Sequence, residues 1–244
     1  MAPTPELSNG GTAGDPVKTK QERTASQSPT HRSPAAVDDG RGEIIAAAAD
    51  CFMEAGYDAT SIDAVADCLG ATKGRIYHYY RSKADLFYDV HRRGMEINLT
   101  TIEPIAGGKG DPLARLTAMC RAHIGNMLDH INFQRVVMQG VEMHLAGATT
   151  PAQRQQLALL MDERERYENM FREVLEQGRK DGIFSFVKAS FASKAVLAIL
   201  NNPVLWYRRR PGEGEAARRL IIDEFTAYAL NCVSAGRSDG GKGK

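Results

Sequence analysis

Residues 60–86 contain the side chains whose types and spacing fit one kind of chemistry, the binding of phosphates and polar base edges. Their sequence is TSIDAVADCLGATKGRIYHYYRSKADL. Between Ala71 and Lys83 lie four basic residues, several aromatic rings, a histidine and no acid. Lysine and arginine neutralise phosphates, and hydroxyl and guanidinium groups also hydrogen-bond base edges. This segment therefore predicts a positively charged surface for a nucleic acid.

Two short helices joined by a tight turn are expected to position these side chains. Apolar residues recur at i, i+3, i+4 and i+7 across residues 62–69, which is the period of an amphipathic helix. Thr60 is its predicted N-cap, Asp63 its predicted capping-box residue and Gly70 its end. A second, more polar helix follows at about 72–79. This arrangement is typical of a helix-turn-helix, whose second helix enters the major groove of DNA.

The rest of the chain between residues 41 and 235 also has a helical pattern. Pro104 is expected to end the helix before it, and Pro112 and Pro151 suit a first helical turn. No stretch alternates with the period of two that strands require, so the predicted fold class is all-α. The further helices are predicted at about 41–56, 82–103, 112–130, 133–145, 151–178, 191–207 and 213–233.

The whole-chain charge argues against nucleic-acid binding, whereas the local charge favours it. The 244 residues carry 31 Lys plus Arg and 30 Asp plus Glu, a formal net charge of +1. Residues 41–70 contain the balancing acids and precede the acid-free segment, so the positive charge is concentrated in one place. No window of about 18 apolar residues and no apolar leader is present, so no membrane partner and a cytoplasmic location are expected.

The cysteines lack the spacing of a metal site or of a disulfide framework. They are therefore predicted to be small buried side chains in a reducing compartment. The four are Cys51, Cys68, Cys120 and Cys232.

Four segments are predicted along the chain. Residues 1–40 include 18 Gly, Pro, Ser or Thr and no aromatic residue, which predicts a disordered extension. Its four basic and five acidic residues argue against a basic DNA-binding arm. A DNA-binding domain at 41–90 and a larger helical domain at 91–235 follow, and 236–244 is a predicted flexible tail.

Residues 41–90 resemble the tetracycline-repressor (TetR) family of bacterial regulators. The resemblance implies a three-helix, helix-turn-helix DNA-binding domain and a helical bundle that binds a small-molecule effector and dimerises. Two departures are Ala71-Thr72, where the family usually has Val-Ser, and Tyr80, where it usually has Phe, so the Tyr80 phenol requires a hydrogen-bond partner. The matching positions are Thr60, Ile62, Val65, Ala66, Gly70, Ala71, Thr72, Gly74, Ile76, Tyr77, Tyr79, Ser82, Lys83, Leu86 and Phe87.

The resemblance also implies which residues contact double-stranded DNA. Phosphate contacts are expected from Thr60, Tyr79 and Lys83. Base-edge contacts are expected from Thr72, Lys73, Arg75 and His78, with Tyr77 near the backbone or a thymine methyl. Gly74 would let the helix approach the duplex closely, and Ser61 is the last of the expected DNA contacts. A position in the core remains an alternative for Tyr77 and Tyr80, and Arg75 has the alternative of pointing away from the groove.

The last two helices are predicted to form a homodimer interface. Residues 191–205 and 220–233 are apolar on more than one face, which is more than one contact within the chain covers. Two-fold symmetry then predicts a palindromic operator. The alternative is an all-α adaptor that uses these helices for another protein, but it leaves the basic segment unexplained. No P-loop, GxSxG or HExxH motif is present, so an enzyme is not expected.

The effector pocket is predicted from adaptable and aromatic side chains, with a plain core position as the alternative for each. His123, His130, Glu142 and His144 do not fix a metal geometry, so no metal and no cofactor are expected. The predicted lining residues are Met95, Leu99, Met127, Phe133, Met138, Met143, Tyr167, Met170, Phe171 and Trp206.

Residues 166–182, with Leu205-Trp206-Tyr207 and Pro211-Gly212, resemble family members that respond to acyl-CoA thioesters. Arg208, Arg209 and Arg210 are then either contacts for an anionic ligand or a solvated helix end. The resemblance implies that the apo dimer occupies its operator and that the effector releases it, with the helix from Ser82 as the lever. Activation is the alternative to repression.

Overall fold

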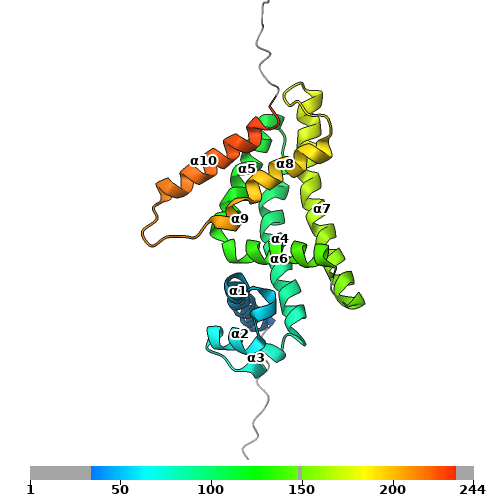
Figure 1. Cartoon of the computed structure of the whole chain (residues 1–244). Coiled ribbons are helices and arrows are strands. Elements are labelled where there is room, and N and C mark those ends of the chain that lie inside the picture. Colours follow the sequence, from blue (N-terminus) through cyan, green and yellow to red (C-terminus); the bar gives the residue numbers. More distant parts are fainter. Residues whose placement is uncertain (1–33, 148–149, 235–244) are drawn as a thin grey trace, which may run out of the picture.

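The computed structural model describes residues 34–147 and 150–234, which form ten helices (Figure 1). Phe184 and Ser234 make one isolated β-bridge, and the described residues form no sheet. The all-α prediction is confirmed. The predicted tail 236–244 and residues 1–33 of the predicted extension lie outside the described residues. The helices are α1 Pro34–Ala59, α2 Ile62–Leu69, α3 Lys73–Tyr77, α4 Lys83–Ala106, α5 Pro112–Asp129, α6 Ile131–Ala146, α7 Pro151–Lys180, α8 Ala189–Asn201, α9 Pro203–Trp206 and α10 Glu215–Asn231.

Helices α1–α3 form a small head at one end of the molecule (Figure 1). α1 begins at Pro34, within the segment predicted to be disordered, and is broken at Gly56, whose φ of 78° favours glycine. The N-cap of α2 is Ser61, whose hydroxyl accepts a hydrogen bond from the Ala64 amide. Thr60 as N-cap and Asp63 as capping-box residue are therefore wrong, each by one position. Gly70 ends α2 as predicted.

Helix α4 is the central element and packs against α1, α5, α6 and α7. It does not end before Pro104 as predicted, but continues to Ala106. The proline cannot donate to the carbonyl of Thr100, and because Thr100 is exposed, water can satisfy that oxygen. Gly94 of α4 faces Val137, and Gly140 of α6 faces His91, so closely that a Cβ at either glycine would clash. These two glycines allow α4 and α6 to cross at short range.

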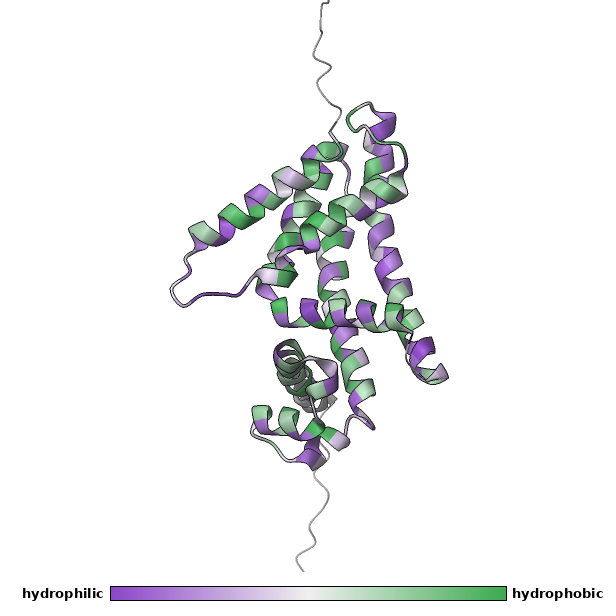
Figure 2. Ribbon diagram, in the orientation of Figure 1, coloured by the Kyte–Doolittle hydropathy of each residue, from purple (hydrophilic) through white to green (hydrophobic). Residues whose placement is uncertain are grey.

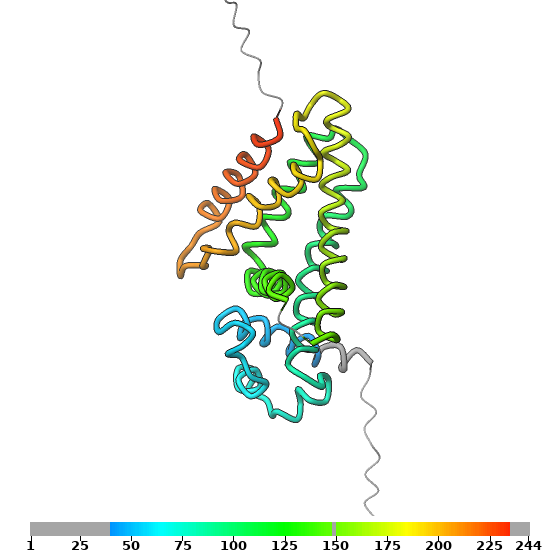
Figure 3. The backbone as a smooth tube through the Cα atoms, turned by 45° about the vertical axis from the view of Figure 1, so that its right-hand side comes forward, coloured from blue at the N-terminus to red at the C-terminus, as the bar shows by residue number. Residues whose placement is uncertain are grey.

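The predicted helix at 191–207 is divided in the structure. Pro203 has no amide hydrogen to continue the ladder of α8, so α8 ends at Asn201 and a short helix, α9, begins. Helices α8 and α10 lie side by side at the far end from the head (Figure 3). Green apolar segments alternate with purple polar ones along both helices (Figure 2).

Two apolar cores hold the molecule together. One, which we call the bundle core, lies between α4, α5, α7, α8 and α10. The other joins the head to the base of α4 and also includes Val136 of α6 and Leu157 and Leu160 of α7. These three side chains come after residue 90, where the predicted DNA-binding domain ends, and yet they complete the core of the head. We call this second core the shared core.

Candidate nucleic-acid interface and ligand pocket

The short helix α3 is anchored by one apolar side chain and leaves its polar side exposed. Ile76 is completely buried against α1 and α2. Thr72 is the N-cap of α3, and its hydroxyl makes no capping hydrogen bond, which leaves it available to a ligand. Five of the predicted DNA contacts are brought together on this exposed side, namely Thr72, Lys73, Gly74, Tyr77 and His78.

Two basic side chains of α3 are paired with acids from the preceding helices. Lys73 Nζ lies 2.6 Å from an Asp63 carboxylate oxygen, and Arg75 forms an ion pair with Glu43 of α1. All four side chains are substantially exposed. The acids of residues 41–70 therefore neutralise the basic segment directly while it is unoccupied, and phosphates would compete with them.

The predicted phosphate contacts divide into available and occupied groups. Ser61 is exposed and Tyr79 is half-buried. Thr60 is only 3% exposed, and its hydroxyl donates to the carbonyl of Gly56 at 2.7 Å, so its predicted phosphate contact is wrong for this conformation. Lys83 donates to the carbonyls of Tyr57 (2.7 Å) and Asp58 (3.1 Å). Its ammonium group thus joins the start of α4 to the end of α1 through these hydrogen bonds.

A buried carboxylate joins the head to α4, and the sequence analysis did not anticipate it. Asp89 accepts two-pronged hydrogen bonds from Arg41 at 2.8 and 3.0 Å and a third from the Tyr80 hydroxyl at 2.6 Å. Arg92 donates at 3.1 Å. Burial alone would raise the pKa of Asp89, but these donors outweigh it and lower that pKa. Asp89 is therefore the partner that Tyr80 was predicted to require.

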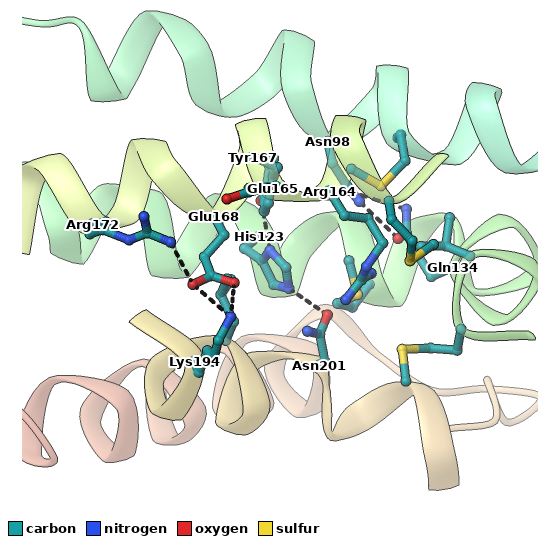
Figure 4. Close-up of a pocket in the computed structure, with 16 residues that line it drawn as sticks. Asn98, His123, Gln134, Arg164, Glu165, Tyr167, Glu168, Arg172, Lys194 and Asn201 are labelled. Atoms are coloured by element: carbon teal, nitrogen blue, oxygen red, sulfur yellow. Dashed lines mark hydrogen bonds and ion pairs between the residues drawn. The ribbon is translucent and has the colours of Figure 1, made fainter. Parts of the chain in front are cut away.

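A cavity of about 380 Å³ lies between α4, α5, α6, α7 and α8 (Figure 4). Its size is within the usual range for small-molecule sites. Four of the predicted residues, Met95, Met127, Met138 and Tyr167, line it. The full lining is Met95, Asn98, His123, Met127, Gln134, Val137, Met138, Met161, Arg164, Glu165, Tyr167, Glu168, Arg172, Lys194, Leu197 and Asn201.

The other predicted pocket residues lie elsewhere. Leu99, Met170 and Phe171 pack in or against the bundle core, whereas Phe133 and Met143 pack against the shared core. Trp206 is 48% exposed. Arg208, Arg209 and Arg210 are exposed beyond α9 and do not line the cavity, which agrees with the solvated helix end, one of their two predicted alternatives.

One group of cavity residues is polar and uncharged. The Tyr167 hydroxyl oxygen lies 2.7 Å from His123 Nδ1, and His123 Nε2 lies 3.2 Å from Asn201 Oδ1. Asn98 donates to Gln134 at 2.9 Å. Burial lowers the pKa of His123 to about 4, so the ring is uncharged at neutral pH. Within the described residues, no group of three or more His, Cys, Asp or Glu side chains could hold a metal ion.

The remaining lining residues carry charge. Glu168 is paired with Arg172 at 3.1 Å and with Lys194 at 2.8 Å. Arg164 extends from α7 between His123 and the Asn98–Gln134 pair (Figure 4). Among the described residues none forms a hydrogen bond or an ion pair with its guanidinium group; burial lowers its pKa, and the charge of Glu168 offsets this only in part. A buried cation without a hydrogen-bonded acid suits an anionic or carbonyl group of a ligand.

Comparison with known proteins decides the family. Residues 44–90 match the family described as "Bacterial regulatory proteins, tetR family", and residues 109–233 match "Tetracyclin repressor-like, C-terminal domain". The chain belongs to the TetR family. This member is a helix-turn-helix transcriptional regulator and not an enzyme. No helix in the described part of the chain is long and apolar enough to span a membrane.

Relatives of this TetR-family regulator align over most of its length. The "HTH-type transcriptional repressor KstR2" of Mycobacterium tuberculosis is 27% identical over 199 residues, 81% of this chain and 94% of that protein. The solved structure of KstR2 from Mycobacterium tuberculosis has a TM-score of 0.67 at 24% identity, over 80% of this chain and 95% of that one. AibR "in complex with isovaleryl coenzyme A and operator DNA" has a TM-score of 0.64 at 20% identity, over 78% and 97%.

The charged and amide residues of the cavity are the part that was missed for this regulator. Each of them lies on a helix whose exposed face is also polar, so periodicity alone does not separate a cavity residue from a solvated one. His123 was considered only as a metal ligand. The polar residues missed are Asn98, His123, Gln134, Arg164, Glu165, Glu168, Arg172, Lys194 and Asn201, and the apolar residues missed are Val137, Met161 and Leu197.

Replacement of Glu43 by glutamine is expected to strengthen binding of random duplex DNA by about two- to five-fold. The change frees Arg75 from an exposed ion pair worth at most about 1 kcal/mol. Fluorescence anisotropy of a labelled duplex at several salt concentrations measures the effect. Glu54→Gln is the matched control, because Glu54 is an exposed acid on the same helix with no partner on α3. Equal effects of the two variants would contradict the pairing argument.

Proposed function

We propose that this regulator is a repressor that binds a palindromic operator as a homodimer and is released by an acyl-CoA thioester. The observation that carries the proposal is the cavity that contains Arg164, whose guanidinium group makes no hydrogen bond or ion pair within the described part of the chain. The cavity lies in the same helical bundle that is joined to the basic helix-turn-helix. The DNA, dimer and effector parts of the proposal rest on different surfaces.

The DNA part of the proposal rests on α3. Thr72, Lys73, Arg75 and His78 would contact base edges, and Ser61 and Tyr79 would contact phosphates. Gly74 is exposed on α3 and presents no side chain, which allows close approach to the duplex. In a two-fold dimer, two such helices bind half-sites about one or more helical turns apart.

The dimer part rests on exposed apolar side chains of α8 and α10. Phe191 is 65% exposed, Leu220 61% and Tyr228 52%. Side chains of this kind gain about 25 cal/mol for each Å² removed from water, so a second copy covering them would be stabilised. The two helices already pack side by side, and pairing them with the same helices of a second subunit forms a four-helix arrangement.

The effector part rests on the chemistry of the cavity. Its lining includes three basic and two acidic residues, methionines and buried amides, which fit a ligand with an apolar body, carbonyl or hydroxyl oxygens and negative charge. Lys194, whose side chain is 63% exposed, and Arg172 pair with the same carboxylate, Glu168, and would face the phosphates of a thioester. The AibR complex with isovaleryl coenzyme A supports this ligand class.

The coupling between effector and DNA would pass along α4. Met95 and Asn98 of α4 line the cavity, and Asp89 on the same helix holds Arg41 and Tyr80 of the head. A ligand that prefers one position of α4 then changes the spacing of the two heads. The shift in operator affinity equals its differential affinity for the two states.

Selection from a random duplex pool with the full-length protein tests the DNA part, since enrichment of an inverted repeat is expected. Absence of any enriched duplex would overturn it and favour the adaptor function. A panel of acyl-CoA thioesters, added to the protein on the selected duplex, then tests the effector part. Release by at least one is expected, and no release by any would overturn it.

Replacement of Arg164 by methionine is expected to weaken the releasing thioester by about 10- to 100-fold, because a charge-assisted contact contributes about 1.5–3 kcal/mol. Isothermal titration calorimetry measures this, and operator affinity should stay unchanged. Arg179→Met is the matched control on the same helix, because Arg179 pairs with Glu176 and does not line the cavity. An unchanged thioester affinity in Arg164→Met would contradict the role of the guanidinium group.

A further inference from the structure

Two thiols face each other inside the head. The Sγ atoms of Cys51 on α1 and Cys68 on α2 lie 3.0 Å apart, and both cysteines are free. A disulfide joins its sulfurs at about 2.05 Å, so closure requires an approach of only about 1 Å. Cys68 is exposed, contrary to the prediction that the cysteines are buried, and so is Cys232.

The two cysteines of this pair differ in exposure, as is expected when one thiol reacts with an oxidant and the other then forms the disulfide. Cys68 is on the surface, where a small oxidant reaches it, and its thiolate is the nucleophile. Cys51 is buried beside it, and burial raises the pKa of its thiol to about 12, so the Cys51 thiol is protonated and Cys68 is the first of the two to react.

We propose that Cys51 and Cys68 form a redox-sensitive modification site, which hydrogen peroxide converts to a disulfide between α1 and α2. The Cys68 thiolate attacks peroxide, an S–O bond forms as the O–O bond breaks, and the departing hydroxide takes a proton to become water. Cys51 then gives up its proton and attacks the sulfenic sulfur of Cys68, an S–S bond forms as the S–O bond breaks, and a second water leaves. Two electrons pass from the thiols to peroxide, and a reducing thiol reverses the reaction.

The disulfide would fasten α2 to α1 immediately before the turn that leads to α3. Closing this loop restricts the unfolded chain and leaves the folded head almost unchanged, because the sulfurs are already in contact. The oxidised protein is therefore expected to unfold at a temperature about 5 °C higher than the reduced protein. The proposal concerns the head and does not depend on the identity of the effector.

Peptide mapping of the full-length protein after treatment with hydrogen peroxide tests the proposal. A Cys51–Cys68 cross-linked peptide, a mass lower by two hydrogens and recovery of both thiols with dithiothreitol are expected. Cys68→Ser should abolish the cross-link and the rise in unfolding temperature. Cys232→Ser is the matched control and should keep both, because Cys232 is also exposed but its thiol donates to the Ala229 carbonyl.

Three outcomes would overturn the proposal. They are a sulfinic acid on Cys68 with Cys51 still free, a disulfide that joins other cysteines, and no change in either thiol at peroxide concentrations that oxidise exposed methionine.

Discussion

Replacement of both Lys73 and Arg75 by alanine is expected to lower the affinity for the selected operator by at least 100-fold. Each base-edge contact of a basic side chain contributes about 1–3 kcal/mol, and each phosphate neutralised adds to the salt dependence. Two such losses correspond to about 3–4 kcal/mol or more, which is a factor of several hundred. Fluorescence anisotropy with the operator duplex measures the effect.

The double variant should fold normally, since both side chains are exposed and their ion pairs with Asp63 and Glu43 are surface pairs. Circular dichroism checks this. The matched control replaces Arg179 and Lys180, two basic residues at the end of α7 far from the head (Figure 1), and should leave affinity within two-fold. A loss of less than five-fold in the α3 variant would show that α3 is not the recognition helix.

Replacement of Asp89 by alanine is expected to lower the free energy of unfolding by about 2–3 kcal/mol. The change leaves the buried Tyr80 hydroxyl and the Arg41 guanidinium group without their acceptor. Loss of one partner of a fully buried pair costs about 3–5 kcal/mol, and the exposure of Arg41 reduces this figure. Urea unfolding measures the change.

Acid supplies a second measurement on Asp89. The folded protein holds the pKa of Asp89 below its unfolded value of about 3.9, so this stabilisation is present above about pH 4 and is lost as the pH falls through the folded pKa. As the pH falls below about 4, the free energy of unfolding should therefore decrease less in the Asp89→Ala variant than in the wild type. Glu96→Ala, on the exposed side of α4, is the control and should cost less than 0.5 kcal/mol. Equal costs of the two variants would contradict the role of Asp89.

The sequence predicted the helices well where a local signal sets them. Gly70 ends α2, and Pro112 and Pro151 begin α5 and α7, because these residues restrict the backbone locally. Pro104 was given too much weight as a helix end, and Pro203 was given none. A helix tolerates Pro104 where water can replace the lost bond, whereas Pro203 divides a helix that periodicity alone joined.

A functional site could be predicted from the sequence where its residues lie close together along the chain, and could not where they come from distant helices. The exposed residues of α3 lie within seven positions of one another, so sequence placed them together. The residues that line the cavity come from five helices, and the periodicity of a helix does not show which other helix its apolar face packs against. Phe171 and Tyr167 illustrate the difficulty, since both are buried on α7 but only Tyr167 lines the cavity. The Asp89 network depends on contacts 9 and 48 residues apart, which no local pattern encodes.

The shared core also limits how this protein can be re-engineered. Val136, Leu157 and Leu160 belong to the sensor by sequence but complete the interior of the head. A chimera cut at residue 90, with a foreign sensor after it, would expose the apolar side chains that these three cover. Exchange of operator specificity between relatives therefore calls for grafting the α3 surface alone, or for transplanting the head together with α6 and the first turns of α7.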